Sequence, residues 1–174
     1  MPSTAEPPLG SGPLDASGDF SDGLGPPLPR IRALALALVI YRDHVLFAEG
    51  SDPIKGEHFL RAPGGEIEFG ERAEEAAARE LLEELGREIH VRALLGVTEN
   101  LFEYRGGRGH ELVFDFVAEW APGAEPPDLE PLAAREGDHI FHTRWVPLSE
   151  LLSGMHHVYP EGLIGRLADW LNTI

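Results

Sequence analysis

Cysteine is absent from all 174 residues of this sequence. Disulfide bonds and thiolate metal sites are therefore excluded, which agrees with a reducing, cytoplasmic location. The first residues show no basic segment followed by an apolar one, so we expect no signal peptide. The longest apolar run, "ALALALVIY" at residues 33–41, is about half of the roughly 20 residues that a membrane helix needs. We therefore expect no membrane span and no membrane partner.

Basic residues are also scarce. The chain has 14 Lys and Arg against 30 Asp and Glu, which gives a formal net charge of -16. Proteins that bind duplex nucleic acid use Lys and Arg to contact phosphates, so this balance argues against such a partner. A metal ion, or a substrate bridged by one, fits the acidic surplus better.

The chain divides into two parts of different composition. Residues 1–29 are rich in Pro, Gly, Ser and Asp and carry apolar residues at no regular period, which predicts a flexible tail. A tail of this kind could instead be an arm exchanged between the subunits of a homodimer. Residues 30–174 contain the apolar segments and are expected to form one domain.

The first half of this domain predicts strands followed by a loop. The uncharged stretch "ALALALVIY" continues an apolar run from Ile31, as in a central strand covered on both faces. A turn at Asp43 and a second strand over residues 43–50 follow. We expect residues 51–65 to be a loop, because Pro63, Gly64 and Gly65 interrupt regular structure.

A helix is predicted over residues 71–85, with Gly86 at the position of a C-terminal cap and Arg87 near the negative end of the helix dipole. At about 100° per residue, the apolar residues group on one side. We expect the buried face to consist of Ala77, Ala78, Leu81, Leu82 and Leu85. Three carboxylates gather on the other side, those of Glu80, Glu83 and Glu84.

Two interpretations of this acidic face stay open at this point. It is either a solvated helix surface, the usual case for a Glu-rich helix, or a metal site. The glycine-rich loop before the helix can bring backbone carbonyls close to a ligand, and Arg79 supplies an internal counter-charge. Ligand sets made only of oxygen select hard cations such as Mg²⁺ or Mn²⁺, which commonly bridge to phosphate.

The spacing of these residues resembles the motif of the Nudix hydrolase family, G-x5-E-x7-R-E-U-x-E-E-x-G-U, in which U is a bulky aliphatic residue. The match is carried by Gly65, Glu71, Arg79, Glu80, Leu81, Glu83, Glu84 and Gly86. Only the last position departs, since Arg87 stands where the family usually has an aliphatic residue. Eight matches at fixed spacing make a specific motif.

The resemblance implies a metal-dependent enzyme that hydrolyses a nucleoside diphosphate linked to another moiety. By similarity, Glu80, Glu83 and Glu84 are metal ligands and catalytic residues, and the Gly65 carbonyl adds a ligand. Arg79 and Glu71 would hold the helix and its carboxylates in register. The ion would neutralise diphosphate oxygens and lower the pKa of a bound water. The other acids of the segment are interpreted as solvated, namely Glu66, Glu68, Glu74 and Glu75.

The resemblance also implies a fold, the family's α/β/α sandwich with a mixed β-sheet and a catalytic loop-helix-loop. The rest of the chain is compatible with it. Residues 91–104 and 110–120 are predicted strands, and "RGGRG" between them is a natural hairpin turn. A later strand stops at Pro147 before a helix start. The C-terminal helix within residues 160–172 should bury Leu163, Leu167, Trp170 and Leu171.

A further acid is expected near the catalytic helix, because some family members use one on a loop before a late strand. Glu136, with Asp138 as the alternative, occupies such a stretch and is predicted as a catalytic residue. An ordinary polar loop residue is the competing interpretation. The eight histidines show no zinc-binding spacing.

The substrate is the least defined part of this prediction. Aromatic side chains stack on nucleotide bases, which makes Phe59, Phe102 and Tyr104 candidates for a base pocket. His110 follows a glycine-rich turn and is a candidate for bordering the substrate. Dinucleoside polyphosphates, ADP-ribose or other nucleotide sugars, and oxidised nucleoside triphosphates all stay open. So does a different class of function, a non-catalytic nucleotide-binding module that acts through a protein partner.

Overall fold

The computed structural model describes residues 27, 29–137 and 139–174. The predicted tail at residues 1–29 lies almost entirely outside the described residues. The chain forms one branched nine-stranded sheet and three helices within the described part. The elements are β1 (Ile31–Tyr41), β2 (His44–Asp52), β3 (Glu57–Arg61), β4 (Gly64–Glu66), α1 (Ala73–Leu85), β5 (Ile89–Tyr104), β6 (Gly107–Trp120), β7 (Ala133–Glu136), β8 (His139–Pro147), α2 (Leu148–Leu152), β9 (Val158–Tyr159) and α3 (Leu163–Leu171).

Strand β1 is central and buried on both faces, as its uncharged sequence predicts. Side chains alternate along a strand, so the leucines and the alanines of "ALALAL" point to opposite faces of the sheet. Leu34, Leu36 and Leu38 enter the core that also contains residues of α2 and α3. Ala35 and Ala37 enter a second core with residues of α1. The small alanines on that side allow the helix to lie close to the sheet.

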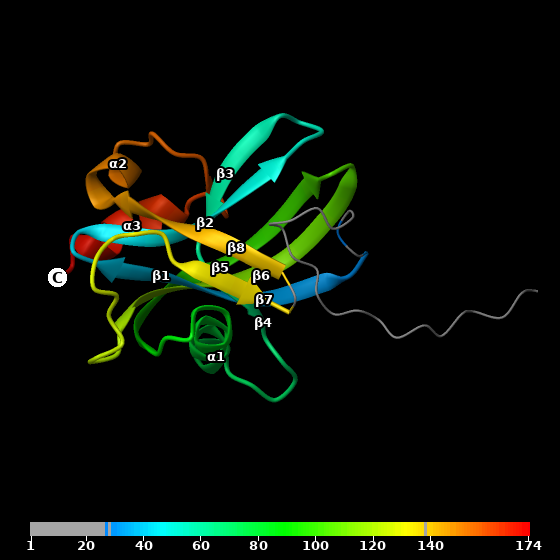
Figure 1. Ribbon diagram of the computed structural model, residues 1–174. Helices are drawn as coiled ribbons and strands as arrows, with labels where there is room; N and C mark the ends of the chain where they lie inside the picture. The colour runs from blue at the N-terminus through cyan, green and yellow to red at the C-terminus, as the bar shows by residue number, and fades with distance from the viewer. Residues whose placement is uncertain (1–26, 28, 138) are drawn as a thin grey trace, which may run out of the picture.

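The sheet is mixed, with β1 at its branch point. The strand order along the main path is β5-β6-β1-β2-β3-β9. Strand β1 pairs parallel with β6 and antiparallel with β2 and β4, while β8 joins β2 to β7. Figure 1 shows α1 on one side of the strands and α2 with α3 on the other. The predicted mixed sheet between helices is confirmed.

The predicted loop at residues 51–65 is wrong, because two strands form within it. Strand β3 pairs antiparallel with β2 and buries Phe59 and Leu60. Strand β4 pairs with β1 through the backbone of the two glycines. Gly64 has a φ of 135°, and a Cβ there would lie 2.1 Å from the Ala35 carbonyl oxygen. Backbone pairing with β1 therefore overrides the usual tendency of Pro-Gly-Gly to interrupt regular structure.

The later elements agree with the sequence. Strands β5 and β6 form a long hairpin whose turn places Arg105 at φ 49° and Gly106 at φ 77°, as in the tight turns expected for such a sequence. Strand β8 ends at Pro147, and α2 follows at once. Helix α3 buries Leu163 and Leu167 completely. In the described part of the chain, no helix is long and apolar enough to cross a membrane.

Candidate active site

Helix α1 carries the matched carboxylates and is fixed at both ends. It begins at Ala73, two residues later than predicted, and the Arg72 N–H donates to the Glu75 carboxylate over 3.1 Å. At the other end Gly86 adopts a left-handed conformation, and its N–H donates to the Leu82 carbonyl. These two caps fix where each turn of the helix presents its side chains.

The predicted buried face of α1 is partly wrong. Ala76, Ala77, Leu81 and Glu84 are buried, whereas Leu82 is 47% exposed. Helical spacing groups residues by direction, but the packing partner decides which direction is inward. Here the sheet contacts the side of the helix that includes Glu84. One of the three carboxylates therefore points into the protein rather than to solvent.

Arg79 is the hub of the acidic face. Its Nε and Nη2 donate to the two oxygens of Glu71 over 2.8 and 3.0 Å. Its Nη1 donates to Glu80 over 2.8 Å and to Glu83 over 3.2 Å. Nη2 also donates to the Glu66 carbonyl over 3.1 Å, which ties the helix to β4. One planar guanidinium thus holds three carboxylates and a backbone carbonyl in a fixed arrangement.

The ionisation of these groups follows from their contacts. Hydrogen bonds from Arg79 hold the pKa of Glu71 below its usual value, against a smaller opposing effect of burial. Burial raises the pKa of Glu80, and the Arg79 guanidinium only partly offsets this. The pKa of Arg79 itself is raised, chiefly by its hydrogen bonds with Glu71. Ionisation is therefore favoured at Glu71, just before the helix, and disfavoured by burial at Glu80 on the helix.

Gly65 and Glu80 lie in direct contact. A Cβ at Gly65 would be 2.3 Å from Glu80 Cδ and 2.5 Å from each carboxylate oxygen. Only glycine therefore allows the β4 backbone to approach this carboxylate so closely. This contact places the Gly65 backbone beside the acidic helix, and the role of the Gly65 carbonyl as a metal ligand stays a prediction.

The carboxylates suit a hard divalent ion in their chemistry. The donor set consists of oxygen alone, and Glu84, at 8% exposure, lines a cavity that Gly64 also borders. Among the described residues, no three acidic or His side chains are close enough together to hold an ion as they stand. Glu80 and Glu83 instead accept hydrogen bonds from Arg79. The residues fit the predicted ion by type and by proximity to Gly65.

A pocket with about 480 Å³ of empty space contains all three aromatic residues predicted for base binding. Phe59 contacts Tyr104 and Tyr159 edge to face, with ring centroids 6.2 and 5.2 Å apart. Phe102 lies across Gly109, where a Cβ would be 2.0 Å from its ring. Aromatic rings from three different strands therefore surround a space suited to a flat apolar ligand.

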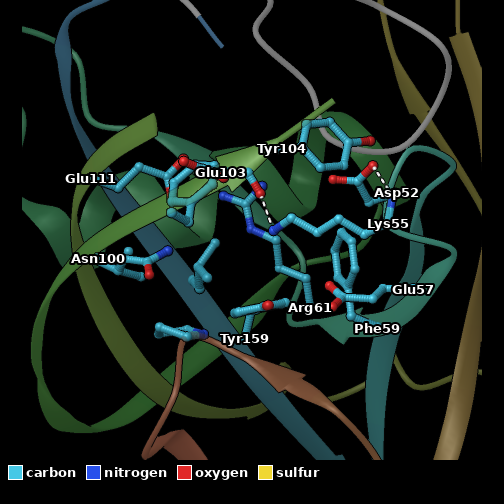
Figure 2. A pocket seen from close by; sticks show the side chains of 14 residues that line it. Asp52, Lys55, Glu57, Phe59, Arg61, Asn100, Glu103, Tyr104, Glu111 and Tyr159 are labelled. Carbon is cyan, nitrogen blue, oxygen red and sulfur yellow. Dashed lines mark hydrogen bonds between the residues drawn. The ribbon is translucent and has the colours of Figure 1, made fainter. Parts of the chain in front are cut away.

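The polar residues of this pocket occupy distinct places (Figure 2). Asn100 and Glu111 lie together away from Phe59 and Tyr104, and Arg61 reaches into the space between the two groups. Arg61 and Phe59 also line a second cavity of about 390 Å³, the one that contains Glu84. The two cavities thus share a wall, which places the aromatic pocket next to the acidic helix.

Asp52 holds the rim of the pocket together. Its carboxylate accepts hydrogen bonds from the N–H groups of Ile54, Lys55 and Arg105 over 2.9 to 3.2 Å. Burial would raise the pKa of Asp52, but these three donors outweigh it and the pKa is lowered. Lys55 Nζ donates to the Glu103 carbonyl over 2.6 Å. The tips of the β2–β3 and β5–β6 hairpins are therefore fastened to each other.

Three further predicted site residues either do not line the aromatic pocket or lie outside the described residues. His110 borders a separate depression with Ile31 and Leu101, and its ring is 3.0 Å from the Glu99 carboxylate. Glu136 is the last residue of β7, a strand that packs against α1, rather than part of the expected loop. Asp138 lies outside the described residues.

The pocket residues that the sequence did not single out include Arg61, Asn100, Glu111 and Tyr159. Arg61 stood in a stretch predicted as a loop. Asn100 and Glu111 share one face of the sheet only because the hairpin register pairs them directly. The alternation of "HELVFDF" signals which residues share a face, but not that a cavity lies beneath one of them.

The sequence matches a known protein family and individual relatives. A sequence profile described as the NUDIX domain matches residues 31–164. "Putative mutator protein MutT4" of Mycobacterium tuberculosis (strain CDC 1551 / Oshkosh) is 32% identical over 118 residues, 67% of this chain and 44% of that protein. "ADP-ribose pyrophosphatase" of Methanocaldococcus jannaschii is 38% identical over 87 residues, 49% of each chain. The chain spans about half the length of the curated relatives it matches.

Solved structures share the fold. A NUDIX hydrolase from Nitrosomonas europaea superposes with a TM-score of 0.58 at 20% identity, over 83% of this chain and 90% of that one. A MutT protein from Methanosarcina mazei Go1 gives a TM-score of 0.54 at 22% identity, over 85% and 100% of the two chains. At these identities the likeness concerns the arrangement of strands and helices.

Proposed function

Given that this chain belongs to the NUDIX family, we propose that it hydrolyses the diphosphate linkage of a nucleoside diphosphate joined to another moiety, with a divalent metal ion as cofactor. One observation carries the proposal: the cavity that holds Glu84 shares Arg61 and Phe59 with the aromatic pocket. An acidic helix face and a base-sized aromatic space thus lie within the span of one nucleotide. The complete set of charged motif positions favours an enzyme over a binding module.

The residues that would hold the ion are Glu80, Glu83, Glu84 and the Gly65 carbonyl. Mg²⁺ or Mn²⁺ bound there supplies neutralisation of the diphosphate charge and activation of water. The contact between Gly65 and Glu80 supports this assignment, and so does the burial of Glu84 beside the cavity. Glu136 is retained as a candidate base because β7 packs on α1.

The protein's own residues would then orient the substrate. Arg79 keeps Glu80 and Glu83 in place, and Glu71 anchors Arg79 from the helix start. Phe59, Phe102 and Tyr104 would contact the base. Arg61 would contact a phosphate, because a guanidinium between the two cavities lies where the diphosphate of a bound nucleotide would cross.

For the substrate class, one curated relative is named as an ADP-ribose pyrophosphatase and the other as a putative mutator protein. ADP-ribose and oxidised nucleoside triphosphates are therefore both candidates. Dinucleoside polyphosphates complete the range that the sequence leaves open. A common feature joins them, since each carries a nucleoside on a diphosphate group.

The test is hydrolysis by the full-length protein of ADP-ribose, nucleotide sugars, dinucleoside polyphosphates and oxidised nucleoside triphosphates. Each reaction is run with Mg²⁺, with Mn²⁺ and with EDTA, and nucleoside monophosphate is detected by chromatography. We expect turnover of one class that stops in EDTA and returns when metal is restored. Turnover unaffected by EDTA would contradict the metal assignment.

A folded protein that hydrolyses nothing in the panel would contradict the enzymatic proposal for these substrates. Calorimetric titration with the same compounds then separates the alternatives. Binding without turnover would favour a nucleotide-binding module, whereas neither binding nor turnover would remove the nucleotide assignment as well.

A further inference from the structure

Glu111 is a buried carboxylate inside the aromatic pocket. The residue is 3% exposed, and it lines the pocket from strand β6. Its Oε1 is shielded from solvent and accepts no hydrogen bond from the described residues. A buried carboxylate oxygen without a donor is unfavourable, because it loses water and gains no replacement. Such a group in a ligand-sized space is suited to a donor that arrives with the ligand.

The ion pair with Arg32 does not use this capacity fully. Arg32 Nη1 lies 3.8 Å from Glu111 Oε1, which is an ion pair but too long for a hydrogen bond. Arg32 compensates the charge of the carboxylate from the adjacent strand β1, where the register places it directly opposite Glu111. Glu111 Oε1 therefore has an ion-pair partner but no hydrogen-bond donor among the described residues.

Asn100 forms a polar edge of the pocket together with Glu111. It lies directly opposite Glu111 across the β5–β6 pair, and both line the pocket, away from Phe59 and Tyr104 in Figure 2. A carboxylate only accepts hydrogen bonds, whereas a side-chain amide both donates and accepts. The aromatic rings can stack on the flat face of a base, and Glu111 with Asn100 can then contact its edge.

We propose that Glu111 is the residue that selects the base, and that it favours bases presenting an exocyclic amino group over those presenting a carbonyl oxygen at the same position. The inference rests on the proposed function, since it takes the aromatic pocket as the nucleoside subsite. Adenine and cytosine each present an amino donor beside a ring nitrogen acceptor. Glu111 accepts from the amino group, and the Asn100 amide donates to the ring nitrogen.

The matching oxo bases reverse both roles. Hypoxanthine and uracil place a carbonyl oxygen where adenine and cytosine have the amino group, and an N–H where they have the acceptor nitrogen. The carbonyl would face the Glu111 carboxylate, acceptor against acceptor, at an oxygen that is shielded from solvent. A site with a buried polar group rejects the ligand that leaves this group unpaired.

The test compares pairs of substrates that differ only at this position. The compounds are the adenosine and inosine forms, and the cytidine and uridine forms, of the diphosphate substrate that the protein turns over. For wild type we expect kcat/KM to favour the amino member of at least one pair by about tenfold or more. For Glu111→Gln we expect the ratio to fall to within about threefold of unity, because the new amide can also donate to a carbonyl.

Glu119→Gln is the matched control, because it makes the same change at an exposed carboxylate of the same strand, outside the pocket. It should keep the wild-type ratio. A second readout is calorimetric binding of AMP against IMP, and of CMP against UMP, without metal. The same preference should appear there, because the base contacts do not involve the acidic helix.

Each outcome decides the inference. A wild-type protein that treats both members of each pair alike overturns it, whether or not the variant folds. A folded Glu111→Gln protein that keeps the amino preference overturns it too, and a lower melting temperature with an unchanged ratio would show a purely structural role beside Arg32. Absence of all turnover contradicts the proposed function instead, and the monophosphate titrations still test Glu111.

Discussion

The acidic helix and the aromatic pocket, the two halves of the site, differ in how many hydrogen bonds their carboxylates accept from the protein. On α1 and just before it, Glu71, Glu80 and Glu83 all accept hydrogen bonds of 2.8 to 3.2 Å from one guanidinium, that of Arg79. In the aromatic pocket, Glu111 Oε1 lies 3.8 Å from Arg32 Nη1 and accepts no hydrogen bond within the described chain. The first group is held by the protein, and the second keeps an acceptor for a ligand.

This difference separates positioning from recognition. A cluster of like charges needs an internal counter-charge before any ion arrives, because the repulsion would otherwise spread the side chains apart. A residue that recognises a ligand needs the reverse, an acceptor that the fold does not consume. Variants can therefore disturb one half of the site while leaving the other intact.

The largest expected effect is on turnover by Glu84→Gln. The change removes the charge of the buried carboxylate beside the cavity at nearly constant shape, so we expect kcat to fall by at least about a hundredfold. Glu74→Gln makes the same change at an exposed position of the same helix and should keep near-normal rates. The two rates are measured on proteins with matching circular dichroism. Equal rates for both variants would remove Glu84 from the site.

Arg79→Ala breaks the positioning half directly. It leaves three carboxylates without their shared cation, and we expect a loss of about 2 kcal/mol in the free energy of unfolding, together with lost activity. Urea unfolding measures the change. Arg92→Ala is the control, because its ion pair with Glu119 is more than half exposed and should be worth well under about 1 kcal/mol. Equal losses for the two variants would refute the special role of Arg79.

Gly65→Ala tests the approach of β4 to the helix. A Cβ at Gly65 would lie 2.3 Å from Glu80 Cδ, so the carboxylate must move. We expect kcat/KM to fall by about tenfold, which corresponds to about 1.4 kcal/mol. At Gly165, on α3, an added Cβ meets no described atom within 4 Å, so Gly165→Ala should preserve the rate and slightly stabilise the helix. An unchanged rate for Gly65→Ala would show that the Glu80 position is not critical.

The smallest expected effect is on the pH dependence of stability. It concerns a third carboxylate, that of Asp115, on the same strand as Glu111. Arg166 Nη2 donates to Asp115 over 2.7 Å, yet complete burial raises the pKa of Asp115 from 3.8 to about 6. A raised carboxyl pKa stabilises the folded state at low pH, and this stabilisation is lost as the pH rises through about 6.

The measurement compares the wild type with Asp115→Asn, which cannot titrate at this position. From pH 7 to pH 5, the free energy of unfolding of the wild type should rise by about 1 kcal/mol relative to that of the variant. Asp169→Asn, at an exposed position, should show no such shift. A difference between wild type and Asp115→Asn that is independent of pH would contradict the raised pKa.

The sequence predicts the acidic helix and its arginine well because this arrangement is local. Gly65 to Gly86 is a continuous segment, and the Arg79 contacts follow from the spacing along one helix and its preceding loop. Strand β1 and the β5–β6 hairpin are predicted equally well, because an uncharged run and a glycine-rich turn are local signals in the sequence. The error at Leu82 and Glu84 has a different cause, because the inward direction of a helix depends on its packing partner.

The recognition half depends on contacts between distant segments. Arg61 comes from β3, which forms only through pairing with β2 and β9. Glu111 and Asn100 meet through the hairpin register, and Tyr159 reaches the pocket from the region before α3. The spacing of residues in the sequence does not predict these contacts between distant segments. The aromatic candidates Phe59, Phe102 and Tyr104 could be proposed from residue type alone, but their common pocket required the fold.

The most direct test of the account is whether the acidic helix and the aromatic pocket bind one ligand together. The measurement is calorimetric titration of a non-hydrolysable methylene analogue of ADP-ribose, with and without Mg²⁺, into wild type, Glu84→Gln and Glu74→Gln. We expect Mg²⁺ to strengthen binding at least about tenfold in wild type and Glu74→Gln, and to have little effect in Glu84→Gln. Equal affinity with and without Mg²⁺ in the wild type would contradict this expectation.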